Sequence, residues 1–231
     1  MEKKDNVIVK VSLVDQVIEQ IRQSIFNFEY KPGDKIDLKE LSEKWGVSRT
    51  PLREAIRKLE AEGLITYKAQ KGFMIRSIQP EEVEKLFVVR KNLESLAGSL
   101  ACDYVTDGEI KEIENIHNKI ITLPDKSDFS KIEDLRVLHQ LNKDFHFKIY
   151  KASKNKFLIQ VISYMWNISA VYIASTLSTP GRINKIIKEH GKILLSLKKK
   201  DKAGVQKAIK KHLDSSEKDI MRGYKKIQKM I

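Results

Sequence analysis

The sequence predicts a mainly α-helical protein in two parts: three helices with a small β-hairpin, followed by an all-α helical bundle of about six helices. Apolar residues recur at helical spacing through most of the chain. Glycine and proline stand where those patterns break. Short strand patterns occur only between residues 64 and 75, so we place the domain boundary after Ser77, with domains at 1–77 and 78–231.

The first domain is predicted from the order of its elements. Its helices are expected over 13–26, between Asp37 and Gly46, and between Ser48 and Gly63, and its strands over 64–67 and 73–75. Asp37 can cap the second helix, and Ser48 or Thr50 can cap the third. Gly46 suits a left-handed residue after a helix. Three helices followed by a hairpin form a winged helix-turn-helix, with the hairpin as the wing.

The second domain shows only helical patterns. They cover residues 80–104, 107–122, 131–152, 155–178, 182–199 and 202–229. The segment 157–181 carries no charge and is long enough to span a bilayer. Amide and hydroxyl side chains interrupt it, so we interpret it as the buried central helix of a soluble domain, with no membrane association.

Composition sets the broad class of protein. The 231 residues are 41% hydrophobic and 32% charged, which is typical of a globular protein. Cys102 is the only cysteine, which excludes an internal disulfide and a cysteine zinc finger and fits a reducing compartment. The first ten residues lack the apolar core of a signal peptide. We therefore expect a cytoplasmic protein.

The net charge of +13 points to an anionic partner without locating it. Residues 1–77 hold 15 Lys and Arg against 12 Asp and Glu, whereas residues 185–231 hold 15 against 5. Most of the excess thus lies in a lysine-rich C-terminal region, where a composition bias explains it equally well. Charge alone does not establish nucleic-acid binding.

The predicted third helix concentrates arginine. Arg49, Arg53 and Arg57 fall within nine positions of a chain that holds 9 arginines and 35 lysines. With Thr50 they share one arc about 100° wide. Because an arginine fork bonds two acceptors at once, on guanine or phosphate, we expect this face to contact DNA in a major groove. The alternative is a solvated face whose arginines pair weakly with glutamates of the same helix.

The segment "LKELSEKWGVSRTPLREAIRKLEAEGLI", followed by "KGFMI", resembles the winged helix-turn-helix of the GntR transcription regulators, over about residues 10–77. The resemblance implies that Arg49, Thr50 and Arg53 contact operator DNA. It adds to the DNA-binding set Lys39, Ser48, Lys71 and Gly72. At the position of Lys39 some members have arginine, and a phosphate contact is reasonable there.

The second domain places histidines on the predicted inner faces of its helices. His146 follows Asn142 by four residues, and His190 and His212 lie on the apolar stripes of two further helices. An inward histidine alone is more often a hydrogen-bonded core residue than a ligand. Three on separate helices make a metal site an equal alternative, and imidazole suits Zn, Ni, Cu or Fe. His139 shares the face of Asn142, and spacing does not exclude it.

The segments "LNKDFHFKIYKASKN", "EHGKIL" and "AIKKHL" resemble the FCD domain, the all-helical ligand domain of the FadR subfamily of GntR regulators. The resemblance implies a divalent transition metal, with Zn or Ni favoured. Its ligands would be Asn142, His146, His190 and His212. Asn142 stands where aspartate is common, which would weaken the site. Other members lack the metal and bind acyl-coenzyme A, so a metal-free acyl-CoA-type sensor is an alternative.

Arg90 interrupts the apolar stripe of the helix expected over 80–104, where an unpaired charge would be costly. It either pairs with a carboxylate on a neighbouring helix or, as the resemblance implies, clamps an organic-acid effector beside the metal. Gln160, Ser163 and Asn167 form a polar stripe on the uncharged helix. They could line the same pocket, although hydrogen bonds between helices explain them almost as well.

These expectations combine into a metabolite-responsive transcriptional regulator, a repressor by the usual mode of the family. Residues 1–77 would bind a short inverted-repeat operator in double-stranded DNA as a homodimer. Residues 78–231 would dimerise and bind the effector, which would change the affinity for DNA. A metal-dependent helical-bundle enzyme is the rival class, but the sequence holds no general base in an HExxH-like motif and no phosphate loop.

Overall fold

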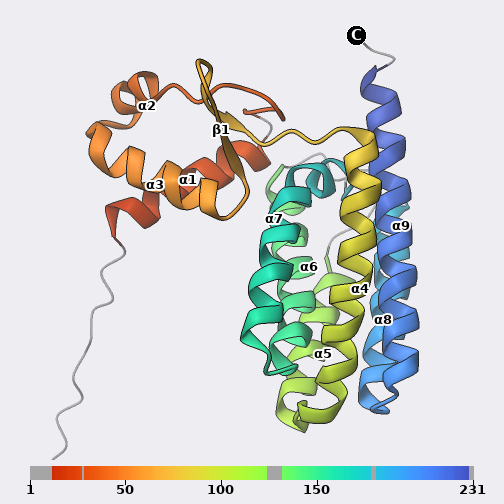
Figure 1. Cartoon of the computed structure of the whole chain (residues 1–231). Helices are drawn as coiled ribbons and strands as arrows, with labels where there is room; N and C mark the ends of the chain where they lie inside the picture. The colour runs from red at the N-terminus through yellow and green to blue at the C-terminus, as the bar shows by residue number, and fades with distance from the viewer. Residues whose placement is uncertain (1–11, 28, 124–131, 178–180, 229–231) are drawn as a thin grey trace, which may run out of the picture. The chain divides into compact units, whose positions relative to one another are not determined.

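The computed structural model describes residues 12–27, 29–123, 132–177 and 181–228 (Figure 1). The chain divides into two compact units, Met1–Arg76 and Ser77–Ile231. The mainly α-helical fold class is confirmed. Among the described residues, no helix is both long enough and apolar enough to cross a membrane.

Three helices form the body of the first unit: α1 Leu13–Phe26, α2 Leu38–Trp45 and α3 Arg49–Ala61. Asp37 caps α2 as expected, since its carboxylate accepts from the backbone N–H of Lys39 and Glu40. Gly46 follows α2 with φ of 65°, a left-handed conformation that favours glycine. Ser48 is the residue before α3, and its side chain makes no capping hydrogen bond there. The short turn between α2 and α3 therefore completes a helix-turn-helix.

The wing is an antiparallel hairpin of β1 Ile65–Lys68 and β2 Gly72–Ile75. Ile65 pairs with Ile75, and Tyr67 pairs with Phe73 near the turn. Both isoleucines are fully buried, and β1 packs against α3, which anchors the base of the hairpin in the core. The strands begin one residue away from the expected segments, 64–67 and 73–75.

The second unit is a bundle of long helices. They are α4 Pro80–Tyr104, α5 Asp107–Ile121, α6 Ile132–Ala152, α7 Lys156–Leu177, α8 Arg182–Lys198 and α9 Lys202–Gln228. A capping box at Gln79 and Glu82, with Pro80 in the first turn, fixes the start of α4. The observed bounds agree with the sequence prediction to within one residue.

The central contact of this bundle is between α4 and α9, which lie along each other for most of their length (Figure 1). Gly98 permits the close approach. A Cβ atom at that position would lie 2.7 Å from Cγ1 of Val205 and would overlap Ile209. Helix α6 packs against α4, and α8 packs against α9. The α4–α9 contact therefore holds together the helices that carry the buried histidines described below.

Helix α7, which carries no charge after Lys156, is part of the core, as the sequence predicted. Trp166 and Ile162 are buried on its inner side. Near its end, the hydroxyl of Tyr172 accepts a hydrogen bond from the backbone N–H of Ile78 at 2.9 Å, which ties α7 to the segment before α4. Among the polar residues of α7, Asn167 is buried in the core and Gln160 is exposed.

Candidate functional site

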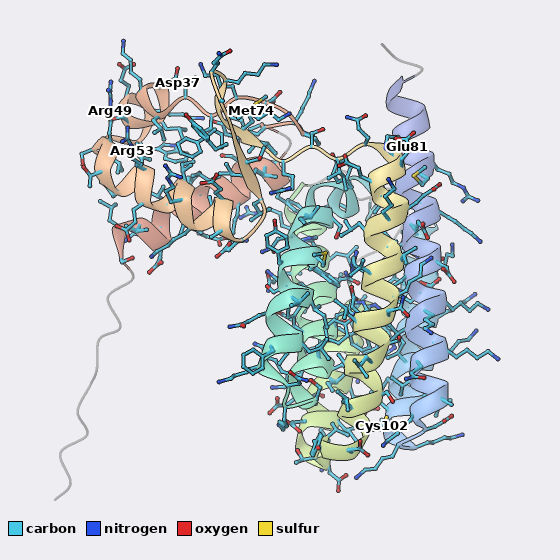
Figure 2. The ribbon with its side chains drawn as sticks, in the orientation of Figure 1. Asp37, Arg49, Arg53, Met74, Glu81 and Cys102 are labelled. Atoms are coloured by element: carbon cyan, nitrogen blue, oxygen red, sulfur yellow. The ribbon has the colours of Figure 1, made fainter. Side chains whose placement is uncertain are left out.

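The exposed face of α3 carries two arginines that point away from their own unit. Arg49 and Arg53 are exposed and form no ion pair with any other residue that the structure describes (Figure 2). The opposite face of α3 is buried in the core through Leu52, Ala55 and Ile56. The two guanidinium groups are thus available to an external anion.

The third arginine of the helix is engaged within the first unit. Arg57 lies 3.2 Å from a carboxylate oxygen of Glu60, and its Cζ atom lies 5.4 Å from the centre of the Phe73 ring. Tyr67 packs edge-on against the same ring, at 5.2 Å between centres. The sequence analysis expected all three arginines to face DNA. Arg57 differs, because it pairs with Glu60 of the same helix and contacts the wing through the ring of Phe73.

The other residues that the sequence assigns to DNA binding lie at the surface of the first unit. Lys39, Ser48, Thr50 and Lys71 are exposed, and Gly72 is half-buried. Lys71 lies in the turn at the tip of the wing, between the two strands. These side chains are accessible to a large polyanion.

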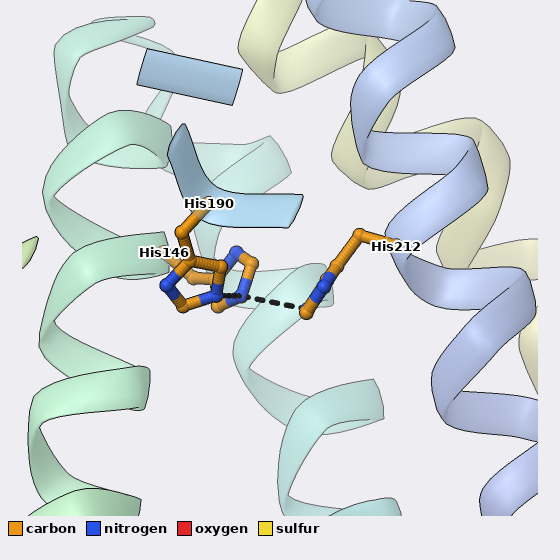
Figure 3. A group of neighbouring side chains, drawn as sticks. All are labelled: His146, His190 and His212. Carbon is orange, nitrogen blue, oxygen red and sulfur yellow. Dashed lines mark hydrogen bonds between the residues drawn. The ribbon is translucent and has the colours of Figure 1, made fainter. Parts of the chain in front are cut away.

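Three histidines from three helices meet inside the second unit (Figure 3). His146 on α6, His190 on α8 and His212 on α9 are all buried. The Nε2 atom of His146 lies 3.1 Å from that of His212 and 3.1 Å from that of His190. Two ligand nitrogens with metal bonds of about 2.1 Å at right angles are about 3.0 Å apart, so this spacing fits one metal ion.

A carboxylate orients His212. Its Nδ1 atom lies 2.8 Å from Oε2 of Glu189, and the same oxygen lies 3.2 Å from Nη1 of Arg182. A carboxylate can only accept, so His212 donates its Nδ1–H, and Nε2 of the neutral ring carries a lone pair. Burial lowers the pKa of His212 despite the opposing effect of Glu189, which favours this neutral form.

A second chain of hydrogen bonds orients His146. Glu94 accepts from Nε of Arg90 at 2.6 Å through one oxygen and from the hydroxyl of Tyr150 at 2.5 Å through the other. The Tyr150 oxygen lies 3.2 Å from Nδ1 of His146. Burial, and then the charge of Glu94, raises the pKa of Tyr150 well above its usual value, so the hydroxyl keeps its proton. Since that proton goes to Glu94, His146 must donate its Nδ1–H to the tyrosine oxygen.

His146 and His212 therefore direct unprotonated Nε2 atoms at each other across 3.1 Å. Two lone pairs at this distance repel each other unless a cation lies between them. A proton is disfavoured, because burial, the neighbouring histidines and Arg182 lower the pKa of His146 and His190 well below the ordinary value. Neutral imidazole nitrogens are ligands for divalent transition metals, so the donor set fits such an ion.

The other two predicted ligands, His190 and Asn142, are both buried in the second unit. The ring of His190 is stacked on Phe145, with centres 4.0 Å apart and planes at 6°, which fixes its orientation. Asn142 lies one turn before His146 on α6 and is 4% exposed. Its Oδ1 atom is buried and has no hydrogen-bond partner among the described residues, so it could accept a ligand or metal bond.

Arg90 is buried, but its carboxylate partner is not on a neighbouring helix. That alternative is wrong in its location, because Glu94 stands four residues later on α4 itself. Arg90 also donates to the Ser169 hydroxyl at 3.0 Å and lies between the rings of Phe87 and Trp166, with Cζ 4.8 and 4.9 Å from their centres. The observed inner line of α4 therefore passes through two charged residues, Arg90 and Glu94.

The polar stripe of α7 does not stay together as a pocket lining. Asn167 is buried, Ser163 is half-buried and Gln160 is exposed. Ser169, which the sequence analysis did not select, is the α7 residue that contacts Arg90. The shift arises because the inner face of α7 follows Ile162, Trp166 and Ser169.

Sequence reasoning missed the residues that orient the histidines. They are Glu94, Tyr150, Arg182 and Glu189. Each had a signal: Tyr150 follows His146 by one turn, Glu94 follows Arg90 by one turn, and Glu189 precedes His190. Arg182 is one of only 9 arginines in a lysine-rich chain.

Comparisons with known proteins agree with both units. The family model of bacterial regulatory proteins of the gntR family matches residues 13–75, and the FCD domain model matches residues 85–215. The HTH-type transcriptional regulator YdhC of Bacillus subtilis is 30% identical over 201 residues, covering 86% of this chain and 87% of its own. The HTH-type transcriptional regulator McbR of Escherichia coli is 25% identical over 202 residues, with 86% and 88% covered.

The fold is also similar to a solved structure. The structure titled E. coli McbR/YncC aligns with a TM-score of 0.77 at 23% identity, covering 93% of this chain and 100% of that chain. At this identity the likeness concerns the fold alone.

Proposed function

Because the chain belongs to the gntR family of bacterial regulatory proteins and contains an FCD domain, it is a transcriptional regulator rather than an enzyme, and we propose that a metal-bound organic acid controls its affinity for an operator. In this proposal α3 and the wing bind double-stranded DNA. The cluster of His146, His190 and His212 holds a zinc or nickel ion. The regulator acts as a repressor, released when its effector binds.

The DNA-binding part of the proposal is supported by the exposed face of α3. Arg49 and Arg53 have no carboxylate partner among the described residues, and their planar forks suit guanine or two phosphate oxygens. Thr50 and Ser48 lie at the start of α3, the end of a recognition helix that enters a major groove. Lys39 and Lys71 would contact phosphates, which positions the helix without reading the sequence.

The observation that carries the metal proposal is the 3.1 Å distance between the Nε2 atoms of His146 and His212, both of which we infer from their hydrogen-bond partners to be unprotonated. His190 provides a third nitrogen at the same distance from His146. Asn142 is the proposed fourth ligand, because its oxygen is buried without a hydrogen bond to any described residue. When bound, the metal would supply a Lewis-acidic centre with positions open to oxygen ligands of an effector.

Charge supports an anionic effector. Arg90 is neutralised by Glu94, and Arg182 lies between Glu189 and Asp219. The two arginines and three carboxylates of these ion pairs sum to a charge of −1, so they do not offset an anion, and a divalent metal would add two positive charges. A small carboxylate that binds the metal near Arg90 and Asn167 would offset them. We omit Gln160 from the proposed pocket because it is exposed, and keep Ser163 at its edge.

A homodimer would match an inverted-repeat operator, since each copy would supply one recognition helix. The second unit offers a surface for a second copy. Its helices α4 and α7, which pack against each other, expose large apolar side chains. These are Val88, Val89, Leu96, Phe157 and Val161.

The metal content of the purified protein tests the proposal. Elemental analysis of the untagged wild type would be compared with His146→Ala and His190→Ala. We expect about one metal ion per chain in the wild type, from the single three-histidine cluster, and a loss of metal in both variants. A wild type that neither contains metal nor binds added Zn²⁺ or Ni²⁺ would refute the metal centre.

Operator binding is tested separately. Duplexes selected from a random pool by the wild-type protein would be titrated by fluorescence anisotropy, with and without small carboxylates. Weaker binding in the presence of one acid supports an effector-released repressor. Absence of any selected sequence would contradict sequence-specific binding by α3.

A further inference from the structure

Glu94 joins Arg90 and Tyr150 of the second unit through hydrogen bonds. Its side chain is fully buried on α4, and its two oxygens have different partners. One oxygen accepts from Arg90, the arginine of the proposed effector site, at 2.6 Å. The other accepts from Tyr150 at 2.5 Å, and Tyr150 in turn accepts from His146. A single carboxylate thus connects Arg90 to a metal ligand.

We propose that Glu94 is a positioning residue that couples the effector arginine to the metal centre through Tyr150 and His146. The inference rests on the proposed function of the histidine cluster. It goes beyond it by assigning two residues that touch neither the metal nor the effector, and by predicting that the two binding events depend on each other.

The direction of the hydrogen bonds supports this role. His146 donates to Tyr150, and Tyr150 donates to a carboxylate, so negative charge at Glu94 is transmitted to the imidazole as increased basicity at Nε2. The same chain excludes the other tautomer of His146, in which Nε2 would be protonated and unable to bind a metal. Glu94 therefore prepares the ligand atom of His146.

The coupling follows from the shared carboxylate. An anion that attracts the guanidinium of Arg90 would weaken its bond to Glu94 and leave that carboxylate to Tyr150. The basicity of Nε2 of His146, and with it the strength of His146 as a metal ligand, would then increase. By linkage, an effector that strengthens metal binding must itself bind more tightly when the metal is present.

The test measures the Zn²⁺ affinity of the full chain by competition with a chromophoric chelator. Tyr150→Phe removes only the hydroxyl that connects Glu94 to His146. We expect it to weaken Zn²⁺ binding by about 10- to 100-fold. The Co²⁺-substituted protein should also show a changed visible absorption band, because the ligand His146 loses its orienting bond.

Tyr172→Phe is the matched control. It removes another buried hydroxyl, bonded to the backbone of Ile78 rather than to the cluster. Its Zn²⁺ affinity and Co²⁺ spectrum should equal those of the wild type, although its unfolding temperature should fall as that of Tyr150→Phe does. This pattern separates positioning of the ligand from a general loss of stability.

Glu94→Gln tests the carboxylate itself. If Glu94 acts through Tyr150, the Zn²⁺ affinity of the double variant should be clearly higher than the product of the two single effects predicts. Independent, multiplying effects would overturn the coupling, as would a Tyr150→Phe affinity within about twofold of the wild type. A wild type that binds no Zn²⁺ would overturn the metal centre and this inference together, whereas the two results above overturn the inference alone.

Discussion

A metal ion in the histidine cluster should stabilise the second unit by an amount that can be calculated from mass action. The cluster is built from α6, α8 and α9, so it forms only when these helices are packed. An ion that binds only the folded chain, at about 1,000 times its Kd, stabilises it by about 4.1 kcal/mol. In a unit of roughly 150 residues, each kcal/mol raises Tm by about 2–4 °C, so we expect a rise of about 8–16 °C.

The assay is thermal unfolding of the full chain, first in a chelator and then with excess Zn²⁺. His190→Ala should abolish the increase in Tm. His117→Ala is the matched control, since its buried ring lies 6.2 Å from that of His190 but outside the three-histidine cluster. It should unfold at a lower temperature than the wild type yet keep the Zn²⁺-induced increase. An equal increase in both variants would refute a metal site at these histidines.

Three further predictions concern binding, packing and pH. Arg53→Ala should weaken binding to the selected duplex by about 1–3 kcal/mol and relax the sequence preference. Arg57→Ala removes the same charge and should weaken binding less. Equal losses of affinity, measured by fluorescence anisotropy, would contradict the assignment of Arg53 rather than Arg57 to DNA contact. Gly98→Ala should lower the free energy of unfolding in urea by about 1–3 kcal/mol, because the new methyl overlaps Ile209; an unchanged midpoint would contradict the close contact. In chelator, the free energy of unfolding should fall from pH 6.5 toward pH 4, because burial lowers the pKa of His139 to about 4 and the unfolded chain therefore binds a proton at higher pH than the folded chain. His139→Gln should reduce this fall by up to about 3 kcal/mol. An equal fall in the variant and the wild type would refute the role of His139.

The helices of both units could be predicted because their signals are local. Pro80 marks the start of α4, and apolar periodicity gives its length to Tyr104. The convergence of His146, His190 and His212 also followed from local patterns, since each lies on an apolar stripe that had to face a shared core.

The contacts of the charged residues could not be predicted in the same way. An apolar stripe is identified from apolar residues, so the sequence places Arg90 as an interruption of the inner stripe of α4 and gives no signal that Glu94 lies there too, although both side chains are buried. The stacking of Arg57 on Phe73 depends on the path of the wing, which residue spacing within α3 does not contain. Side-chain partners across elements require the tertiary structure.

The adjacency of Glu189 and His190 gives helix α8 a particular mechanical role. His190 is a proposed ligand, and Glu189, the residue before it, holds His212, a proposed ligand from another helix. Turning α8 about its axis would withdraw a ligand and release the tautomeric control of a second in the same movement. Metal binding would thus oppose rotation of α8. A conformational change that rotates this helix would have to disrupt two ligand contacts rather than one.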